Sequence, residues 1–332
     1  MNWDIAGHEW AATLLQQHII RGQTRHAYLF SGPPGVGKRS LALRFAQALN
    51  CPKPPQPGEP CGQCRSCQLI ERMQHPDLMV VQAETEGTIL KIDQVRDLQR
   101  LLSLSPFESR YRIALLLRFH EANDNAQNAL LKMLEEPPAR AILLVSADSP
   151  ESLLPTIVSR CEVLRLRPLK VDDLALQLEK RLSVPPERAL VLAHLASGRM
   201  GYALRLHADP ELYEARRAWV AELLELLTFS RRKRIKYAEQ FSKSGGRERL
   251  RAALTAWLPA WRDLFLAAAG SQAPLANLEQ AEELQSLAAR IGLPGARRLL
   301  DQMERGLEKL DGTNINAQML AEVLMMDWPR LG

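Results

Sequence analysis

Short apolar runs alternate with stretches of helical periodicity along the first half of the chain. Each run is bounded by polar or turn residues, a pattern that predicts buried strands over residues 27–31, 78–82, 112–117 and 141–146. Apolar residues at helical spacing predict intervening helices over 39–49, 92–102 and 122–135, the last stopped by Pro137 and Pro138. This alternation is typical of an α/β domain with a parallel sheet.

The pattern changes after Arg167. From residue 171 onward, Ala, Leu, Glu and Arg recur at helical spacing and β-branched alternation is nearly absent, which predicts helices only. A break near His207–Pro210 divides this half. We therefore expect an α/β domain over 1–167, a small helical domain over 168–207 and a helical bundle over 208–332. Tryptophans that we expect to pack in helix cores stand at positions 219, 257 and 261.

Composition narrows the class of protein. The 332 residues are 46% hydrophobic and 24% charged, which excludes wholesale disorder. The net charge of +5 permits a nucleic-acid partner without demonstrating one. No stretch approaches the roughly 18 apolar residues of a membrane span, and the amino terminus has no apolar signal core. We expect a cytoplasmic protein. The basic run 231–236 favours a solvated helix face or a junction, with a nucleic-acid patch as the alternative.

Residues 32–38, GPPGVGK, match most of a phosphate-binding loop placed after a strand and before a helix. Glycines at positions 32, 35 and 37 let backbone N–H groups converge on phosphate oxygens, and Lys38 adds a full positive charge. The loop has a defect, because Arg39 stands where a Ser or Thr normally holds Mg²⁺. Ser40 comes one residue too late, and one residue turns a helix by about 100°.

The acidic strand end that completes such a site is also absent. The strand predicted over 112–117 runs into Leu117-Arg118, with no Asp or Glu at its tip. We expect Glu121, further on, to begin or cap the following helix. The joint loss of the hydroxyl and the carboxylates predicts that hydrolysis has been abandoned, while binding of ATP or ADP stays open.

Four of the five cysteines, Cys51, Cys61, Cys64 and Cys67, form the pattern C-x9-C-x2-C-x2-C. Thiolates at this spacing can surround one tetrahedral Zn²⁺ at about 2.3 Å per bond and close its coordination sphere. The sequence therefore predicts a structural zinc module over 51–67. Free or oxidised thiols and a redox C-x-x-C are the weaker alternatives.

Ser159-Arg160-Cys161 follows an apolar stretch near the end of the α/β domain. By composition alone Arg160 is a surface arginine. An arginine at this place can also reach into a neighbouring subunit and stabilise the charge of phosphoryl transfer.

Together these motifs resemble the bacterial clamp-loader family, the AAA+ subunits of DNA polymerase III. The features that carry the resemblance are GPPGVGK, the cysteine cluster after it, NALLKMLEEPP at 128–138 and SRC at 159–161; INAQMLAEVLMM at 315–326 is similar to the last helix of the family's collar. The resemblance implies an AAA+ domain, a helical lid and a collar that joins a ring. It also implies gamma/tau and delta subunits as partners, and a sliding clamp placed on primed DNA.

The departures from the family pattern indicate which kind of member this is. Motor subunits keep the Ser/Thr, an Asp-Glu pair and a lid arginine, where this chain has Arg39, Leu117-Arg118 and, within GRMGYAL, Gly201. The resemblance thus implies a stator that does not hydrolyse ATP and lends Arg160 to a neighbour's site. The alternatives are an active gamma/tau-type ATPase and a zinc-stabilised DNA-binding protein that uses the basic run.

Overall fold

The computed structural model describes residues 3–85 and 87–330. The chain divides into two compact units. One contains the chain up to Leu169 and the short segment Arg199–Tyr202; the other contains Lys170–Gly198 and the chain from Ala203 onward. Within the described residues, no helix is both long enough and apolar enough to span a membrane.

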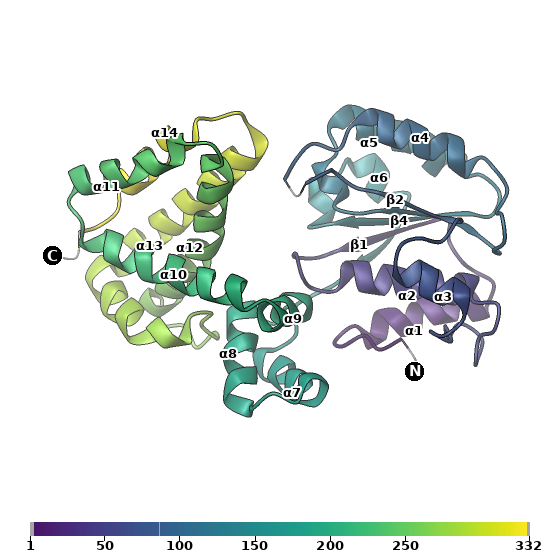
Figure 1. Ribbon diagram of the computed structural model, residues 1–332, viewed down its shortest axis with the longest axis horizontal. Helices are drawn as coiled ribbons and strands as arrows, with labels where there is room; N and C mark the ends of the chain where they lie inside the picture. Colours follow the sequence, from purple (N-terminus) through teal and green to yellow (C-terminus); the bar gives the residue numbers. More distant parts are fainter. Residues whose placement is uncertain (1–2, 86, 331–332) are drawn as a thin grey trace. The chain divides into compact units, whose positions relative to one another are not determined.

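A five-stranded parallel sheet is the centre of the first unit (Figure 1). The strand order is β2-β3-β4-β1-β5, with bounds Leu78–Val81, Arg112–Leu116, Ala141–Ala147, Ala27–Ser31 and Glu162–Arg165. The four predicted strands are confirmed. The strand β5 was not predicted, because its sequence EVLR is short and alternates apolar with charged residues.

Helices cover both faces of the sheet (Figure 1). On one face lie α1 (Glu9–Ile20), α2 (Lys38–Asn50) and α3 (Arg65–Glu71), and on the other lie α4 (Ile92–Leu102), α5 (Asp124–Glu135) and α6 (Pro155–Val158). Side chains of one strand alternate between the two cores: Tyr28 and Phe30 join the first, Ala27 and Leu29 the second. The strands are apolar throughout because both of their faces are covered.

The second unit is helical. It contains α7 (Val171–Leu182), α8 (Pro186–Ala196), most of α9 (Met200–Ala208), α10 (Pro210–Thr228), α11 (Arg231–Ala238), α12 (Gly246–Ala268), α13 (Ala281–Gly312) and α14 (Ala317–Met326). The helix α13 is interrupted at Gly292, whose φ of 70° only glycine adopts readily.

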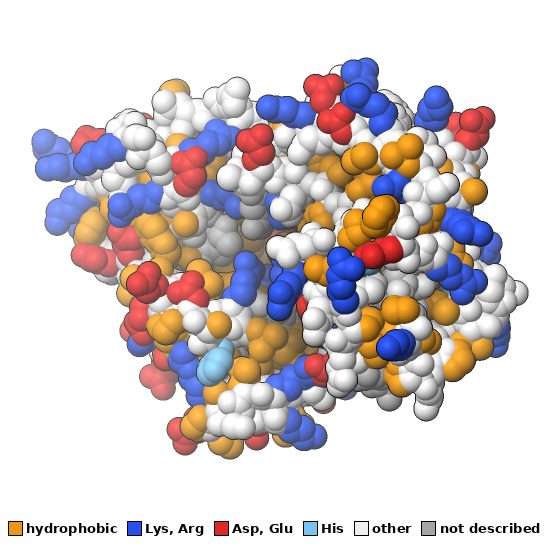
Figure 2. Space-filling model, turned by 45° about the vertical axis from the view of Figure 1, so that its right-hand side comes forward, with side chains coloured by type: hydrophobic (Ala, Val, Ile, Leu, Met, Phe, Trp, Pro, Cys, Tyr) orange, Lys and Arg blue, Asp and Glu red, His pale blue; other side chains and the backbone are white. Residues whose placement is uncertain are grey.

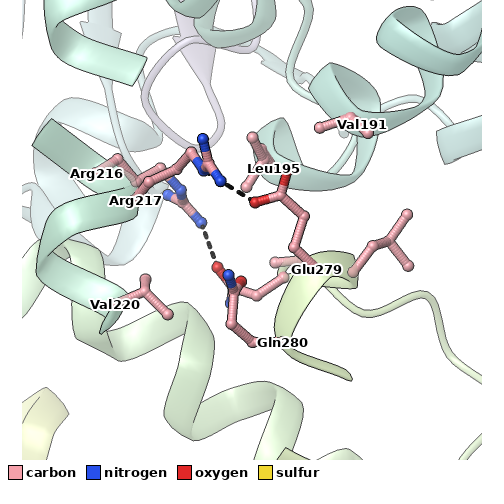
Figure 3. A pocket seen from close by; sticks show the side chains of 10 residues that line it. Val191, Leu195, Arg216, Arg217, Val220, Glu279 and Gln280 are labelled. Atoms are coloured by element: carbon pink, nitrogen blue, oxygen red, sulfur yellow. Dashed lines mark hydrogen bonds and ion pairs between the residues drawn. The ribbon is translucent and has the colours of Figure 1, made fainter. Parts of the chain in front are cut away.

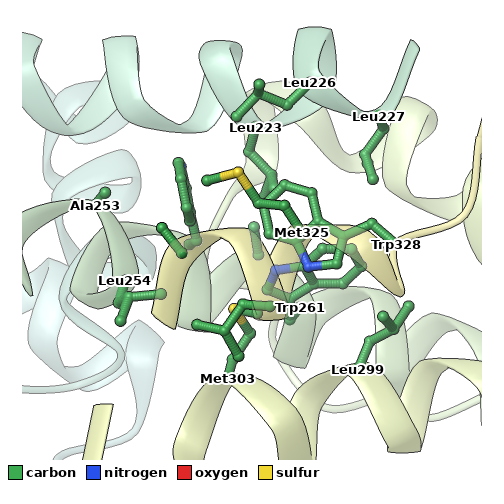
Figure 4. Packing of buried hydrophobic residues seen from close by; sticks show 14 of the residues in the cluster. Leu223, Leu226, Leu227, Ala253, Leu254, Trp261, Leu299, Met303, Met325 and Trp328 are labelled. Carbon is green, nitrogen blue, oxygen red and sulfur yellow. The ribbon is translucent and has the colours of Figure 1, made fainter. Parts of the chain in front are cut away.

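Tryptophans fill the centre of this bundle (Figure 4). Trp257 and Trp261 on α12 are 0% and 1% exposed, and both rings pack against Trp328 at centroid distances of 5.4 and 5.5 Å. Trp219 is partly buried and meets Trp257 edge to face. The prediction that these three helical tryptophans pack in the core is confirmed.

A polar joint inside the second unit links α10 to the loop before α13 (Figure 3). Arg217 pairs with Glu279 at 3.0 Å, and the neighbouring Arg216 donates to Asn277 Oδ1 at 3.4 Å. Buried Asp263 accepts from the backbone N–H groups of Ala276 and Asn277, both at 2.8 Å. The cavity between these groups measures 10 Å³, about the room of one water molecule, so the joint is no ligand site.

Candidate functional site

The glycine loop between β1 and α2 has the backbone that a phosphate cradle needs. Gly32, Gly35 and Gly37 have φ of 147°, 80° and 114°, all in the region that side chains disfavour. At Gly32 a side chain is also excluded sterically, because an added Cβ would collide with the carbonyl group of Leu166. The helix α2 begins at Lys38, so its free N–H groups face the loop.

Lys38 is occupied by partners within its own unit. Its ammonium group donates to Asp148 Oδ1 at 2.7 Å and to the carbonyl oxygen of Gly32, and the residue is only 9% exposed. His120 Nε2 lies 3.5 Å from the second oxygen of the same aspartate. A phosphate group would therefore compete with Asp148 for the lysine. Arg39 is exposed at the next position and supplies no hydroxyl ligand.

A short segment of α9 lies directly on the glycine loop. The N–H of Gly201 donates to Gly35 O at 2.8 Å, and a Cβ added at Gly35 would lie 3.0 Å from the Tyr202 backbone. A Cβ added at Gly201 would lie 2.9 Å from Gly35 O. The position that the family resemblance assigns to a lid arginine therefore has no room for a side chain here.

The tip of β3 carries a cation in place of the usual carboxylates. Arg118 has a left-handed backbone with φ 49°, and its N–H donates to Ser146 Oγ at 3.0 Å. Its Nε donates to both carboxylate oxygens of Glu121 at 3.0 Å. Glu121 also accepts from Gly87 N at 2.8 Å, and 8% of its side chain is exposed. The Glu121 carboxylate is therefore occupied by Arg118 and Gly87.

The expectation that Glu121 begins or caps the following helix is wrong. Glu121 ends a 3-10 turn, and α5 is capped by Asn123, whose side chain accepts from Ala126 N at 2.9 Å. Asparagine is a preferred N-cap residue. Glu121 does not cap α5 because its carboxylate is hydrogen-bonded to Arg118, before the helix begins.

The four predicted zinc ligands converge. The Sγ atoms of Cys51, Cys61, Cys64 and Cys67 all lie within 4.8 Å of one another, and Cys61 and Cys67 are 3.9 Å apart. A tetrahedron with bonds of about 2.3 Å has edges of about 3.8 Å, so the cluster fits one zinc ion. Four thiolates leave no open position for water, which suits a structural ion.

Backbone N–H groups support the thiolates. Cys64 N donates to Cys61 Sγ at 3.3 Å, and Cys67 N donates to Cys64 Sγ at 3.4 Å. Burial raises the pKa of the Cys61 thiol, but the N–H groups of Cys64 and Gln63 outweigh burial and lower that pKa to about 6. Cys161 lies outside the cluster, and burial raises its pKa to about 12. Burial raises the pKa of the Cys51 and Cys67 thiols, so the backbone favours the thiolate form at Cys61 and not across the whole cluster.

The cysteine module is joined to the end of the phosphate-loop helix. Cys51 directly follows α2, and buried Gln47 of that helix donates to Cys67 O at 2.8 Å. Asn50, the last residue of α2, accepts from Ser66 Oγ through its carbonyl oxygen at 3.3 Å. Its side chain exchanges two hydrogen bonds with the backbone of Tyr111, beside β3. The module therefore connects α2 to the start of β3.

Arg160 lies at the surface, just after α6. Its guanidinium group donates to Thr156 O at 3.0 Å and pairs with Glu135 Oε1, at the end of α5, also at 3.0 Å. The side chains are 37% and 52% exposed, so solvent screens the pair. Unlike Lys38, this cation remains accessible.

Sequence reasoning missed Asp148 and Glu135, the partners of Lys38 and Arg160, and it named Glu121 without its pairing to Arg118. Asp148 directly follows β4, and polar residues at the carboxyl ends of parallel strands commonly face the ligand crevice, so this signal was available. The pairing of Arg160 with Glu135 had no local signal, because the two residues are distant in sequence.

The parallel sheet, with a glycine loop between β1 and α2, defines the first unit as an α/β domain of the phosphate-loop class. Residues 7–170 match the family described as DNA polymerase III, delta subunit. This stretch is similar to that family over just under half of the chain, and the resemblance predicted from the motifs is confirmed.

Individual relatives agree. The chain is 40% identical over 202 residues to DNA polymerase III subunit delta' of Pseudomonas aeruginosa, covering 60% of this chain and 61% of the relative. It is 35% identical to subunit delta' of Bacillus subtilis, covering 64% and 63%. It is also 35% identical to subunit tau of Escherichia coli, covering 61% and 32%. The matches thus span less than two thirds of each relative's length.

Proposed function

We propose that this chain is the delta-prime subunit of a DNA polymerase III clamp loader, and that it acts as a stator without ATP hydrolysis of its own. Residues 1–167 would form the AAA+ domain, 168–207 the lid and 208–332 the collar that joins gamma/tau and delta subunits in a ring. The ring would place the sliding clamp on primed DNA in the cytoplasm. The family match of the first unit and the two delta' relatives support this assignment.

One observation carries the proposal: the hydrolytic positions of the loop are replaced, and their surroundings are internally paired. Arg39 stands in place of the Mg²⁺-binding hydroxyl, Arg118 occupies the β3 tip, and Glu121 is bound to Arg118. Phosphoryl transfer needs Mg²⁺ ligands and a group that orients the nucleophile. The described residues around Gly32, Gly35, Gly37 and Lys38 retain a cradle for phosphate, but the Mg²⁺-binding hydroxyl and the acidic β3 tip are replaced, and Asp148 is paired with Lys38.

Arg160 is the residue that we propose acts in trans. A guanidinium group presents a planar fork of donors that matches phosphate oxygens, and its charge is permanent. Its partners here are one exposed carboxylate and one backbone carbonyl, so a more highly charged phosphate could replace them. In GTPases a supplied arginine accelerates hydrolysis on the order of 10³–10⁵-fold.

Cys51, Cys61, Cys64 and Cys67 would hold one structural zinc ion. A bound ion would supply a covalent-like crosslink between the end of α2 and the start of α3. Hydrogen bonds add to this crosslink, because the side chain of Gln47 binds the module to α2 and the side chain of Asn50 binds the end of α2 to Tyr111. The module would thereby keep the α/β domain rigid, which a stator requires.

Two assays test the proposed function. The purified chain alone should hydrolyse ATP no faster than buffer, and addition of the chain to gamma/tau and delta subunits should give a complex that loads clamps on primed DNA. A complex that assembles and loads clamps equally well without this chain would contradict the proposal.

An active gamma/tau-type ATPase is the second candidate, favoured by the 35% identity to tau and by the intact glycine geometry. Under that candidate the isolated chain would show Mg²⁺-dependent ATP turnover that Lys38→Ala abolishes. Arg39→Ala, at the exposed neighbouring position, is the matched control.

A further inference from the structure

The helix α11 in the second unit carries an arrangement of charge that the fold itself does not require. Its first residues are Arg231, Arg232 and Lys233, and its first turn holds no acidic residue. Cations at a helix N-terminus face the positive end of the helix dipole and are disfavoured there. Among the described residues, no carboxylate forms an ion pair with these three side chains or with Lys236. Lys233 does lie over the Phe229 ring, at 5.4 Å.

A buried arginine fixes this helix in place. Arg234 is 1% exposed and donates to Leu226 O and Leu227 O, at the end of α10, at 2.8 and 3.0 Å. It also donates to Trp328 O and Pro329 O, beyond α14, both at 2.7 Å. Leu226 O also accepts from Phe229 N at 3.1 Å, whereas the described residues supply no backbone donor to the carbonyl groups of Leu227, Trp328 and Pro329, so one guanidinium group satisfies these three. These hydrogen bonds fix α11 against the ends of α10 and α14.

Arg232 and Lys236 lie on the face of α11 opposite Arg234, whereas Lys233 lies about 100° and Arg231 only about 60° from Arg234 around the helix. At about 100° per residue, Arg232 and Lys236 lie close together at the centre of the outer arc, with Arg231 and Lys233 at its two sides. All four are exposed, while the inward side chains Arg234 and Ala238 are buried. Figure 2 shows Lys and Arg side chains spread over one face of the molecule, with a group of them at its left edge.

We infer that Arg231, Arg232, Lys233 and Lys236 form a surface that binds the phosphate backbone of duplex DNA without reading its sequence. Four positive charges on a rigid helix of eight residues match a row of regularly spaced phosphates. An anionic membrane fits less well, because a helix that binds membranes presents an apolar face to lipid, and the apolar face of α11 is packed in the core. The exposed side of α11 carries one large apolar side chain, that of Ile235, which is 39% exposed.

The inference does not depend on the proposed clamp-loader role, because its test needs only the full chain. The DNA-surface variant changes Arg231, Arg232, Lys233 and Lys236 to Gln. The matched control changes Arg297, Arg298, Arg305 and Lys309 to Gln; these four are exposed on α13 and interspersed with Asp301, Glu304 and Glu308. Each variant removes four charges from the same net +5, so a difference between them reports position and not total charge.

The probe is a fluorescent 20-base-pair duplex, titrated by anisotropy between 50 and 200 mM salt. Each engaged cation contributes about 0.9 to the slope of log affinity against log salt, so the DNA-surface variant should flatten the slope by about 2 to 4 and the control by less than about 1. The thermal midpoint of the DNA-surface variant should equal or exceed that of the wild type, because it removes cations from a helix N-terminus.

Equal slopes for the two variants would overturn the inference. So would an effect confined to vesicles of phosphatidylserine and phosphatidylcholine, since the partner would then be a lipid surface. A lower thermal midpoint would show that the cations serve the fold, which also contradicts the inference.

Discussion

Two cations of the first unit, Lys38 and Arg160, stand in opposite situations. Lys38 is buried and bound to Asp148 and Gly32 of its own domain, whereas Arg160 is exposed and held by one screened carboxylate. The first arrangement keeps a phosphate-loop lysine engaged internally. The second leaves an arginine available to another molecule. The contrast distinguishes a cation that is held by its own domain from one that another molecule can reach.

The largest expected effect belongs to Arg160. Arg160→Ala should lower ATP hydrolysis at the one site of a reconstituted clamp loader that faces this subunit, on the order of 10³-fold at that site. The bulk rate should fall less, because other sites continue to turn over. Arg160→Lys should restore little, since an ammonium group lacks the planar fork. Steady-state ATP turnover with DNA and clamp present measures the effect.

Arg165→Ala is the matched control, because Arg165 is an exposed arginine of the same unit and pairs with Glu151 at 3.3 Å. Gel filtration should show equal assembly for both variants. Arg160 would be only a surface residue if its alanine variant turned over ATP like the Arg165 variant.

The second prediction concerns the cysteine module over residues 51–67, which is joined to the end of α2. The purified chain should contain about one Zn²⁺, and Cys64→Ser should remove most of it, because three thiolates bind the ion more weakly than four. Limited proteolysis should then cut within residues 51–67. Cys161→Ser should retain the metal, since Cys161 lies outside the cluster. Elemental analysis of protein prepared without chelator measures the zinc content of the wild type and of the two variants. A wild type free of zinc would refute the prediction.

The third prediction extends the comparison to Arg234, a cation satisfied internally like Lys38. Arg234→Met should lower the free energy of unfolding by about 3 kcal/mol, because it leaves the carbonyl groups of Leu227, Trp328 and Pro329 without this donor. Arg232→Met, on the exposed face of the same helix, should change it by less than about 0.5 kcal/mol. Urea denaturation followed by tryptophan fluorescence compares the two. Similar losses would show that the hydrogen bonds of Arg234 contribute little.

The smallest effect should come from Glu135, the exposed partner of Arg160. Glu135→Gln weakens a screened ion pair worth about 0.2–1 kcal/mol, so ATP turnover of the reconstituted complex should rise by no more than about fivefold. Glu136→Gln, the adjacent exposed residue, should leave turnover unchanged. A large fall in turnover with Glu135→Gln would mean that Glu135 aligns Arg160 instead of competing for it.

The sequence predicted the parts of the fold that local patterns control. Apolar runs identified β1 to β4 because strands covered on both faces exclude polar side chains. The spacing of the four cysteines predicted that their thiols converge, because these residues are close in the chain. The strand β5 escaped because EVLR lacks such a run, and its place beside β1 comes from long-range pairing.

What the sequence could not supply was the set of partners for each charge. The pairs Lys38–Asp148 and Arg160–Glu135 join residues far apart in the chain. The glycine at position 201 was explained by family resemblance as a lost arginine. The structure adds a local physical reason, since the loop carbonyl of Gly35 leaves no space for a Cβ there. Burial and tertiary contact decide such features, and neither has a short-range signature.

The most direct test of the central claim compares Lys38→Ala with Arg160→Ala in the same reconstituted loader. Each variant is assembled with wild-type gamma/tau and delta subunits, and DNA-stimulated ATP turnover is measured at equal complex concentration. The account predicts that Lys38→Ala turns over ATP at the wild-type rate while Arg160→Ala is slowed. A loader slowed by Lys38→Ala and unaffected by Arg160→Ala would contradict it, because the chain's own loop would then be the working site.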